Sequence, residues 1–374
     1  MHIADMTMFY APSSGGVRTY LEAKRRRLVH YPGLTHSLLV PGKHYRHRQD
    51  GLVEVPSPPL PFSNGYRFPL RRKHWLQALR DTQPNLIEAG DPYVTAWAAV
   101  EARRELDVPV VGFYHSDLPL LIGNRFGNVA SRGIGQYVSK LYRHYDRILA
   151  PSHVMAGKLA KLGLEHVHVQ PLGVDTKTFS PTLRDDNFKR ELGLAEETRL
   201  LIFAGRGSRE KNLHVLLHTM EQLGEGYHLL LVGSCMPEQV PENVSVINHF
   251  CPPEELARMM ASSDALLHAG TQETFGLVVL EAMASGIPVV AVRAGALAEN
   301  IPETCGRLCE PNNPGAMASA IRELFTHDSR ALGLKARKHV ERHYDWDAVV
   351  HGIYQHYCTV LGTLEETTPS MQHG

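Results

Sequence analysis

The chain has 374 residues, of which 43% are hydrophobic and 21% charged, and its formal net charge is zero. This composition suits a globular protein with two domains of roughly 150–200 residues each. No run of eighteen apolar residues is present, and residues 1–6 lack a basic start followed by an apolar stretch. An ordinary membrane-spanning helix is therefore excluded, and we expect no signal peptide and a cytoplasmic location.

Short apolar runs alternate with longer amphipathic stretches along the whole chain. In the first half we predict strands at 2–9, 37–40, 86–88, 108–114, 147–150 and 166–170, with helices at 17–30, 93–106, 135–145 and 154–162. In the second half we predict strands at 199–204, 228–232, 244–247, 265–268 and 288–292, with helices at 213–223, 253–262 and 314–326. This alternation predicts the α/β class, with two doubly wound parallel sheets.

A turn-rich stretch separates the two halves. It begins Pro171-Leu172-Gly173 and ends before Phe179-Ser180-Pro181, so we place an N-terminal domain at 1–172 and a C-terminal domain at 173–345. A last helix is expected to open near Trp346 and to run to about residue 361, followed by a polar tail to residue 374.

The net charge of zero hides an opposition between the halves. Residues 1–170 carry 22 Lys and Arg against 13 Asp and Glu, whereas residues 171–374 carry 17 against 26. The first half is therefore at +9 and the second at −9. Such an excess suggests that the first half meets an anionic partner, which could be a membrane surface, a phosphorylated acceptor or nucleic acid.

Cysteine and histidine do not indicate a metal site. All five cysteines lie in the second half without a CxxC pair, and the 22 histidines form neither HExxH nor another ligand cluster. We expect reduced structural cysteines, no metal and no cofactor.

Two glutamates frame the most informative segment. Glu273 precedes the predicted start of a helix at Phe275-Gly276, and Glu281 lies eight residues on, about two turns away if the stretch is helical. Helix N-termini offer unpaired amides to anions, and carboxylates accept hydrogen bonds from hydroxyl groups, so the segment suits a sugar nucleotide. The alternative is a capped helix with two solvated glutamates.

The segment 272–291 resembles the donor-binding signature of retaining glycosyltransferases of family 4. The resemblance implies the GT-B fold, with two Rossmann-like domains facing each other across a cleft and the last helix packing back on the first domain. It also implies roles for single residues: Glu273 would hold the sugar hydroxyls, and Glu281 would accept from the ribose. The backbone amides of Phe275, Gly276 and Leu277 would contact the sugar or the phosphate.

Two cations lie at the head of the second domain. Arg206 and Lys211, five residues apart after a predicted strand, align with the diphosphate-binding pair of the family. Fixed cations stabilise the charge that builds on a departing nucleoside diphosphate, so no metal is required. Arg209 between them fits a solvated position.

A glycine pair follows the first predicted strand. Gly15-Gly16 leads into a helix, and glycine lets a backbone approach a phosphate closely. A simple tight turn is the alternative, but the place matches the glycine loop of the family, where Gly16 would face the donor diphosphate. Because no G-x-G-x-x-G follows this strand and no G-x-x-x-x-G-K-[ST] occurs, dehydrogenase-type and P-loop sites are disfavoured.

His115 ends an apolar strand, where ligands bind in open α/β sheets. A structural hydrogen bonder is the alternative, whereas in the family a histidine here reaches the donor sugar and stabilises an oxocarbenium-like transition state. Asp117 could contact the acceptor hydroxyl. The run His-Ser-Asp-Leu-Pro also looks like His-Thr-Asp-x-Pro in relatives that glycosylate diacylglycerol-type lipids.

Two downstream glycine positions complete the resemblance. Gly295-Ala296 is similar to a Gly-Gly turn of the family, with alanine at the second position, which puts a close approach of this loop to the ligand in doubt. Gly306 is expected in a structural turn.

Basic segments suggest contact with an anionic membrane. Arg25-Arg26-Arg27 lies on the first predicted helix, and residues 66–76 interleave basic and aromatic side chains. Such clusters favour anionic leaflets, although a solvated helix face with core aromatics is the alternative. Nucleic acid is less favoured because no binding module accompanies the charge.

The sequence as a whole predicts a retaining, metal-independent glycosyltransferase. It would move a hexosyl unit from a nucleotide sugar, UDP being favoured by family frequency, to a hydroxyl acceptor such as a membrane lipid of the diacylglycerol type. The alternatives are a polysaccharide or small-molecule acceptor, a sugar-nucleotide epimerase of the same fold, and a non-catalytic membrane-docking or sensing protein.

Overall fold

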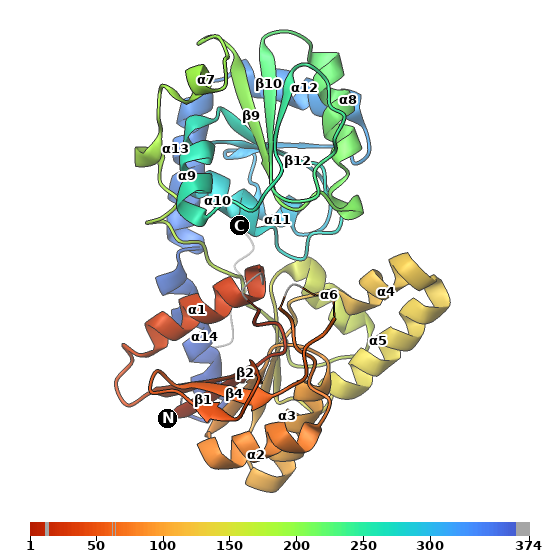
Figure 1. Ribbon diagram of the computed structural model, residues 1–374, viewed down its shortest axis with the longest axis vertical. Helices are drawn as coiled ribbons and strands as arrows, with labels where there is room; N and C mark the ends of the chain where they lie inside the picture. Colours follow the sequence, from red (N-terminus) through yellow and green to blue (C-terminus); the bar gives the residue numbers. More distant parts are fainter. Residues whose placement is uncertain (12–14, 62, 64, 364–374) are drawn as a thin grey trace, which may run out of the picture. The chain divides into compact units, whose positions relative to one another are not determined.

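The computed structural model describes residues 1–374 except 12–14, 62, 64 and 364–374, so the predicted polar tail lies outside the described residues. The chain divides into two compact units (Figure 1). The N-terminal unit comprises Met1–Pro171 and the chain from Val349 onward, and the C-terminal unit comprises Leu172–Ala348.

The N-terminal unit is built on a sheet that, within the described residues, has eight strands in the order β3-β4-β2-β1-β5-β6-β7-β8. All neighbours pair in parallel except β3 with β4. The strands are β1 (His2–Met6), β2 (Thr35–Gly42), β3 (Arg46–His47), β4 (Leu52–Pro56), β5 (Leu86–Ala89), β6 (Val110–Phe113), β7 (Arg147–Ala150) and β8 (Val167–Val169). Its helices are α1 (Gly16–Leu28), α2 (Arg72–Thr82), α3 (Val94–Leu106), α4 (Leu118–Phe126), α5 (Asn128–Tyr142), α6 (His153–Lys161) and most of α14 (Trp346–Val360).

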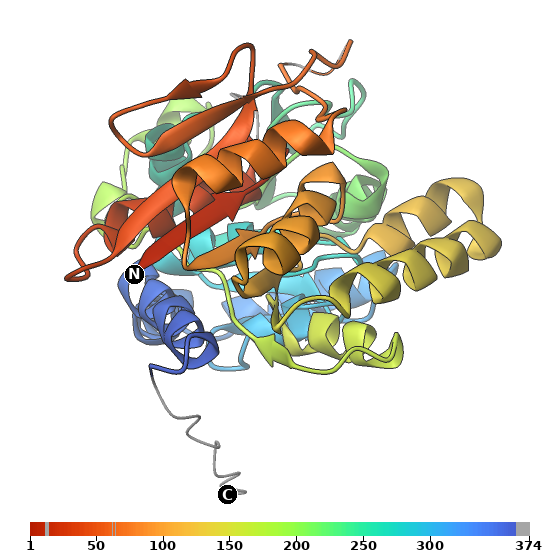
Figure 2. The same cartoon turned by 90° about the horizontal axis from the view of Figure 1, so that it is seen from below.

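The two faces of β1 pack against different layers because successive side chains of a strand point in opposite directions. Ala4 and Met6 join a hydrophobic core with Trp75 of α2. Asp5 points the other way and contacts Lys24 of α1. Beyond the sheet, α4 and α5 form a helical hairpin that projects from the rest of the unit (Figure 2).

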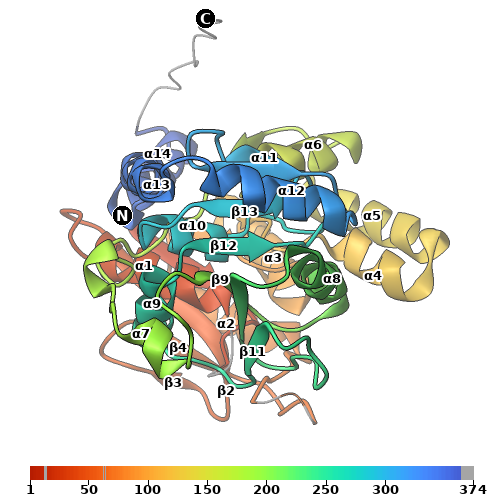
Figure 3. The ribbon, with the colours of Figure 1, turned by 90° about the horizontal axis from the view of Figure 1, so that it is seen from above.

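The C-terminal unit has, in its described residues, a six-stranded parallel sheet in the order β11-β10-β9-β12-β13-β14. The strands are β9 (Arg199–Ala204), β10 (Tyr227–Val232), β11 (Val244–Ile247), β12 (Ala265–His268), β13 (Val289–Val292) and β14 (Gly306–Cys309). The helices are η1 (Pro181–Leu183), α7 (Phe188–Glu191), η2 (Arg209–Lys211), α8 (Leu213–Leu223), α9 (Pro253–Ser262), α10 (Leu277–Ala284), α11 (Leu297–Asn300), α12 (Pro314–Phe325) and α13 (Ser329–His343). Helices α8 and α12 lie side by side, and α10 packs against α9 and α13 (Figure 3).

Several elements differ from the sequence predictions. Gly306 opens strand β14 rather than a turn, and a Cβ at this position would lie 2.1 Å from the carbonyl oxygen of Val289 on β13. Glycine is thus needed for the close approach of two strands. Trp75, which we had placed in a membrane-facing segment, is fully buried in the core. No helix within the described residues is long and apolar enough to cross a bilayer.

Candidate functional site

The C-terminal unit changes strand order between β9 and β12. The chain proceeds from β9 through β10 to the edge strand β11 and then returns to place β12 on the other side of β9. The loops after these two neighbouring strands therefore diverge at one carboxyl edge of the sheet, where open α/β sheets bind ligands. The loop after β9 contains Arg206 and Lys211, and the loop after β12 contains Glu273.

An ion pair joins these two loops. The ammonium group of Lys211 donates to Oε1 of Glu273, and both side chains are only partly exposed. A second link comes from the amide nitrogen Nδ2 of Asn212, which donates to the carbonyl oxygen of Ala269 at 3.1 Å. Two residues that the sequence predicted for the site are thus brought together.

His268, which was not predicted from the sequence, lies next to the carboxylate of Glu273. The imidazole is buried at the end of β12, and its Nδ1 accepts the backbone N–H of Gly270 at 3.1 Å. The imidazole proton must then lie on Nε2. Nε2 is 3.1 Å from Oε1 of Glu273. A Cβ on Gly270 would lie 2.6 Å from Cε1 of His268, so this arrangement requires glycine there.

Both contacts reach the same carboxylate oxygen of Glu273. Burial by itself would raise the pKa of Glu273, but His268 and the Lys211 ammonium outweigh it and lower the pKa to about 2. The group is therefore an anion at neutral pH. Within the described residues no hydrogen bond or ion pair reaches Oε2, so this oxygen can accept hydrogen bonds from a ligand.

Helix α10 begins at Leu277, with Gly276 in the left-handed region at φ 85°. Glu273 therefore lies in the loop before the helix, as the sequence predicted, and Glu281 lies in the helix itself. The amides of a first helical turn have no partner inside the helix, which leaves those near Gly276 and Leu277 for a ligand. Phe275 is buried, and its carbonyl oxygen accepts from Nδ2 of Asn300 at 2.5 Å.

The turn after β13 fixes the backbone of Glu273. Ala296 donates its N–H to the carbonyl oxygen of Glu273 at 3.1 Å. A Cβ on Gly295, whose φ is +54°, would lie 2.7 Å from the same oxygen. Ala296 itself has φ −71°, a conformation open to any residue, so this turn holds Glu273 closely without a second glycine.

Glu281 is half-buried on α10. Burial raises its pKa to about 7, and none of the described residues forms an ion pair with it. The structure does not join it to Glu273. Arg206 is exposed and likewise has no ion-pair partner among the residues described, so it is free to reach an added anion.

The glycines around Arg206 bring two loops into contact. A Cβ on Gly207 would lie 2.1 Å from the carbonyl oxygen of Cys235, and one on Gly233 would lie 1.9 Å from that of Gly205. The loops after β9 and β10 are therefore packed backbone to backbone, which fixes the base from which Arg206 projects.

In the N-terminal unit, His115 follows β6 and stacks on Phe113, with ring centroids 4.3 Å apart and planes at 13°. The ring of Tyr20 lies 4.9 Å away in edge contact. Burial, with a smaller contribution from the Lys24 ammonium, lowers the pKa of His115 to about 3. The imidazole is therefore neutral at physiological pH and can offer a hydrogen bond but not a positive charge.

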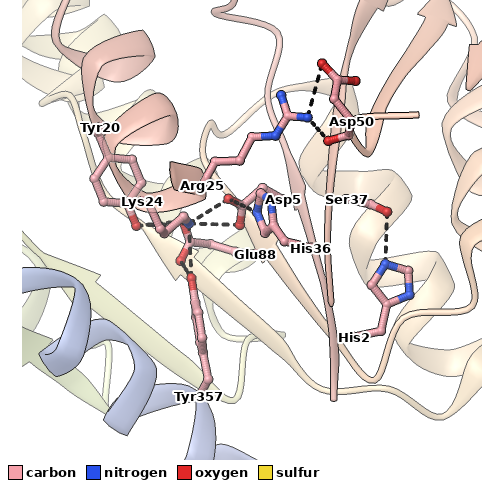
Figure 4. Close-up of polar contacts among 10 residues, drawn as sticks. All are labelled: His2, Asp5, Tyr20, Lys24, Arg25, His36, Ser37, Asp50, Glu88 and Tyr357. Carbon is pink, nitrogen blue, oxygen red and sulfur yellow. Dashed lines mark hydrogen bonds and ion pairs between the residues drawn. The ribbon is translucent and has the colours of Figure 1, made fainter. Parts of the chain in front are cut away.

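A buried charged network, here called the Lys24 network, lies beside this histidine (Figure 4). Nζ of Lys24 donates to Asp5 at 2.9 Å, to Glu88 at 2.6 Å and to the hydroxyl of Tyr357 on α14 at 3.0 Å. The hydroxyls of Tyr20 and Tyr357 donate to the two oxygens of Glu88 at 2.9 and 2.5 Å. His36 holds the second oxygen of Asp5 at 2.8 Å.

The pKa values of the two acids in this network shift in opposite directions. Burial raises the pKa of Glu88. For Asp5 the charges of Lys24 and His36 outweigh burial, so its pKa is lowered. The ammonium group of Lys24 and both oxygens of Asp5 and of Glu88 have partners, so we assign the network to holding α1, β1, β5 and α14 together.

Two further predicted residues have structural partners. Asp117 caps α4 by accepting the N–H of Leu120 at 3.2 Å, and it forms an ion pair with Lys158 at 2.6 Å. Gly16 is the first residue of α1 and is exposed, and Gly15 separates it from the undescribed residues 12–14.

One group of potential metal ligands comes together that the sequence did not suggest. Among the described residues, donor atoms of His249, Cys251 and Glu255 all lie within 4.8 Å of one another near the start of α9. Cys251 is buried and the other two are exposed. None of the three belongs to the predicted donor site.

Known families match both halves of the chain. A family described as Glycosyltransferase Family 4 matches residues 14–178, and one described as Glycosyl transferases group 1 matches residues 184–342. A GDP-mannose-dependent alpha-mannosyltransferase of Mycobacterium tuberculosis is 30% identical over 300 residues, which cover 77% of this chain and 76% of that protein. The chain belongs to glycosyltransferase family 4.

Two other relatives of this glycosyltransferase differ in length and named substrate. A sulfoquinovosyl transferase of Arabidopsis thaliana is 32% identical over 71% of this chain, which spans only 55% of that protein. A GDP-mannose-dependent alpha-(1-6)-phosphatidylinositol dimannoside mannosyltransferase of M. tuberculosis is 28% identical over 91% of this chain and 92% of its own length.

Solved structures show that this glycosyltransferase has the GT-B fold. A sucrose-phosphate synthase from Thermosynechococcus elongatus matches with a TM-score of 0.80 at 20% identity, over 97% of this chain and 100% of that one. WaaG, a glycosyltransferase involved in lipopolysaccharide biosynthesis, matches with a TM-score of 0.68 at 15% identity, over 94% and 98%. At these identities the likeness concerns the fold alone.

Proposed function

We propose that the protein transfers a hexosyl unit from a nucleotide sugar to a hydroxyl acceptor with retention of configuration and without a metal ion. The observation that carries the proposal is the Lys211–Glu273–His268 group at the strand-order change of the C-terminal sheet. It offers a cation to a diphosphate and a carboxylate oxygen to sugar hydroxyls at the place where such sheets bind ligands.

In the proposed reaction the bond from the anomeric carbon to the diphosphate oxygen breaks, and a bond to the acceptor oxygen forms on the same face. The acceptor proton passes to an oxygen of the departing diphosphate. Arg206 and Lys211 stabilise the charge that develops there. Glu273 holds the sugar hydroxyls through Oε2, Glu281 accepts from the ribose, and the neutral His115 donates a hydrogen bond to the sugar. Gly16 and the amides of residues 275–277 complete the donor contacts.

The acceptor we propose is a membrane lipid hydroxyl, reached at the inner face of the membrane through the basic N-terminal unit. One relative supports a lipid by name, since it is a phosphatidylinositol dimannoside mannosyltransferase. For the nucleotide of the donor, family frequency favours UDP, whereas the mycobacterial relatives depend on GDP-mannose. Contact of Asp117 with the acceptor stays a prediction.

The test compares Lys211→Ala with Arg209→Ala, a control change in the same loop at an exposed arginine. Purified protein is given a panel of UDP- and GDP-sugars with diacylglycerol or phosphatidylinositol, and both sugar transfer and donor hydrolysis are measured. We expect Lys211→Ala to lower kcat/KM by about 100-fold, since removing one donor of a charge-stabilising site costs that much, and Arg209→Ala to leave it within about twofold. Equal rates for the two variants would remove Lys211 from the site. An isomerised donor in the absence of acceptor would instead support an epimerase.

A further inference from the structure

The hairpin of α4 and α5 exposes apolar side chains at its tip. Leu121 is 53% exposed, Phe126 64% and Val129 83%, and all of the residues from Asn124 to Val129 are exposed. Burying such side chains is favourable, and a cluster on one projection marks an interaction surface more clearly than scattered ones do.

The two helices touch each other through small residues. A Cβ on Gly123 of α4 would lie 3.0 Å from Cβ of Ser131 on α5. Because the contact between the helices uses these small side chains, the large ones near Gly127 are left outside. The hairpin therefore presents Leu121, Phe126 and Val129 outward while the far end of α5 packs on the core through Val138 and Leu141.

The charge along this hairpin has one sign. Between Asp117 and Asp146 the chain contains no acidic residue and four basic ones, all of them exposed: Arg125, Arg132, Lys140 and Arg143. On α5 the spacing of Val129, Arg132, Gln136 and Lys140 places them along one stripe of the helix. None of the four basic residues forms an ion pair with a described residue, so all four remain available to an anionic surface.

We infer that the α4–α5 hairpin docks on an anionic lipid bilayer, with Phe126, Val129 and Leu121 entering the headgroup region and the four basic residues meeting lipid phosphates. Apolar side chains surrounded by Lys and Arg without acids match such a surface in both polarity and charge. The surface differs from the two predicted from the sequence, because Trp75 is a core residue and Arg25 is held by Asp50 at 3.4 Å. Use of the docked state for sugar transfer rests on the proposed function, whereas the docking itself does not.

The experiment is flotation of the full chain with vesicles of phosphatidylcholine, alone or with about one third phosphatidylglycerol, in the absence of nucleotide. We expect binding to the anionic vesicles, weak binding to the neutral ones, and release by salt because the contact is electrostatic. The double variant Phe126→Glu/Val129→Glu should lower the bound-to-free ratio by at least about tenfold, and Arg125→Gln/Arg132→Gln should remove the preference for anionic lipid.

The matched control is Leu334→Glu, which places the same charge on a 54% exposed leucine of α13. It should bind vesicles like the unchanged protein. A thermal-shift response to UDP or GDP that is equal in all variants shows that each variant is folded. If the unchanged protein gives no response, that result counts against the proposed function only. Failure of the unchanged protein to bind anionic vesicles, or equal binding by Phe126→Glu/Val129→Glu, overturns the inference. So does a change of oligomeric state without a change in lipid binding, which would identify the hairpin as a contact between copies.

Discussion

Two clusters of similar chemistry, one in each unit, differ in how fully their polar atoms are used. The Lys24 network and the Lys211–Glu273–His268 group each contain a lysine, a carboxylate and a histidine. In the first, Nζ of Lys24 contacts oxygen atoms of four residues, and both oxygens of Glu88 are occupied. In the second, one oxygen of Glu273 takes both contacts and the cluster is partly exposed. A saturated buried cluster holds a fold together, whereas one with spare acceptors can bind a ligand.

The largest effect is expected from Lys24→Met. This change leaves Asp5 and Glu88 as buried carboxylates without their cation, and breaking a buried pair in this way costs about 3–5 kcal/mol. Urea unfolding would measure the loss, with the exposed Lys73→Met as control. If Lys24→Met and Lys73→Met unfold at the same urea concentration, the Lys24 network is not the structural support described here.

A smaller effect is expected at His268. Replacement by leucine removes the Nε2 proton beside Glu273, so the pKa of Glu273 should rise from about 2 toward its ordinary value. The acid limb of kcat/KM should then move to higher pH, with about a tenfold loss in the acid range. His268→Gln keeps an N–H donor, so the acid limb of kcat/KM should shift less in this variant than in His268→Leu. A loss that is the same at every pH would show that His268 acts through packing alone.

The smallest effect concerns Glu281. Burial raises its folded-state pKa to about 7, so the protonated form stabilises the folded state below its ordinary pKa of 4.5, and this contribution is lost as pH rises through 7. Glu281→Gln should flatten this part of the pH dependence. Unfolding free energies at about pH 5 and about pH 8 provide the measurement, and an unchanged slope would mean that Glu281 is better solvated than its position on α10 indicates.

The α/β class and most central strands could be predicted because buried parallel strands are short apolar runs. Arg147–Ala150, Arg199–Ala204 and Ala265–His268 lie at their predicted bounds. Two edge strands carry a weaker signal: β14 begins with glycine and arginine, and β3 has only two exposed residues, so neither was foreseen. Helix α4 was missed because its exposed apolar residues lack the periodicity of a half-buried helix.

The candidate site likewise contains residues that the sequence predicted and one that it did not. The motifs assigned Lys211 and Glu273 to one donor site, but their ion pair was not predicted, and His268 was taken only as the end of a strand. Its role depends on which nitrogen carries the proton, and that is set by the N–H of Gly270, a contact that no sequence spacing encodes. The acceptors around Lys24 likewise come from residues up to 333 positions away from it in the chain.

That last separation has a consequence for synthesis of the protein. Tyr357 completes the Lys24 network from α14, 333 positions after Lys24, so the N-terminal unit lacks one of its buried partners until this helix has left the ribosome. A fragment ending near Pro171 would expose Glu88 of β5 to solvent. A chimera that exchanges the first half between relatives also needs the matching helix α14.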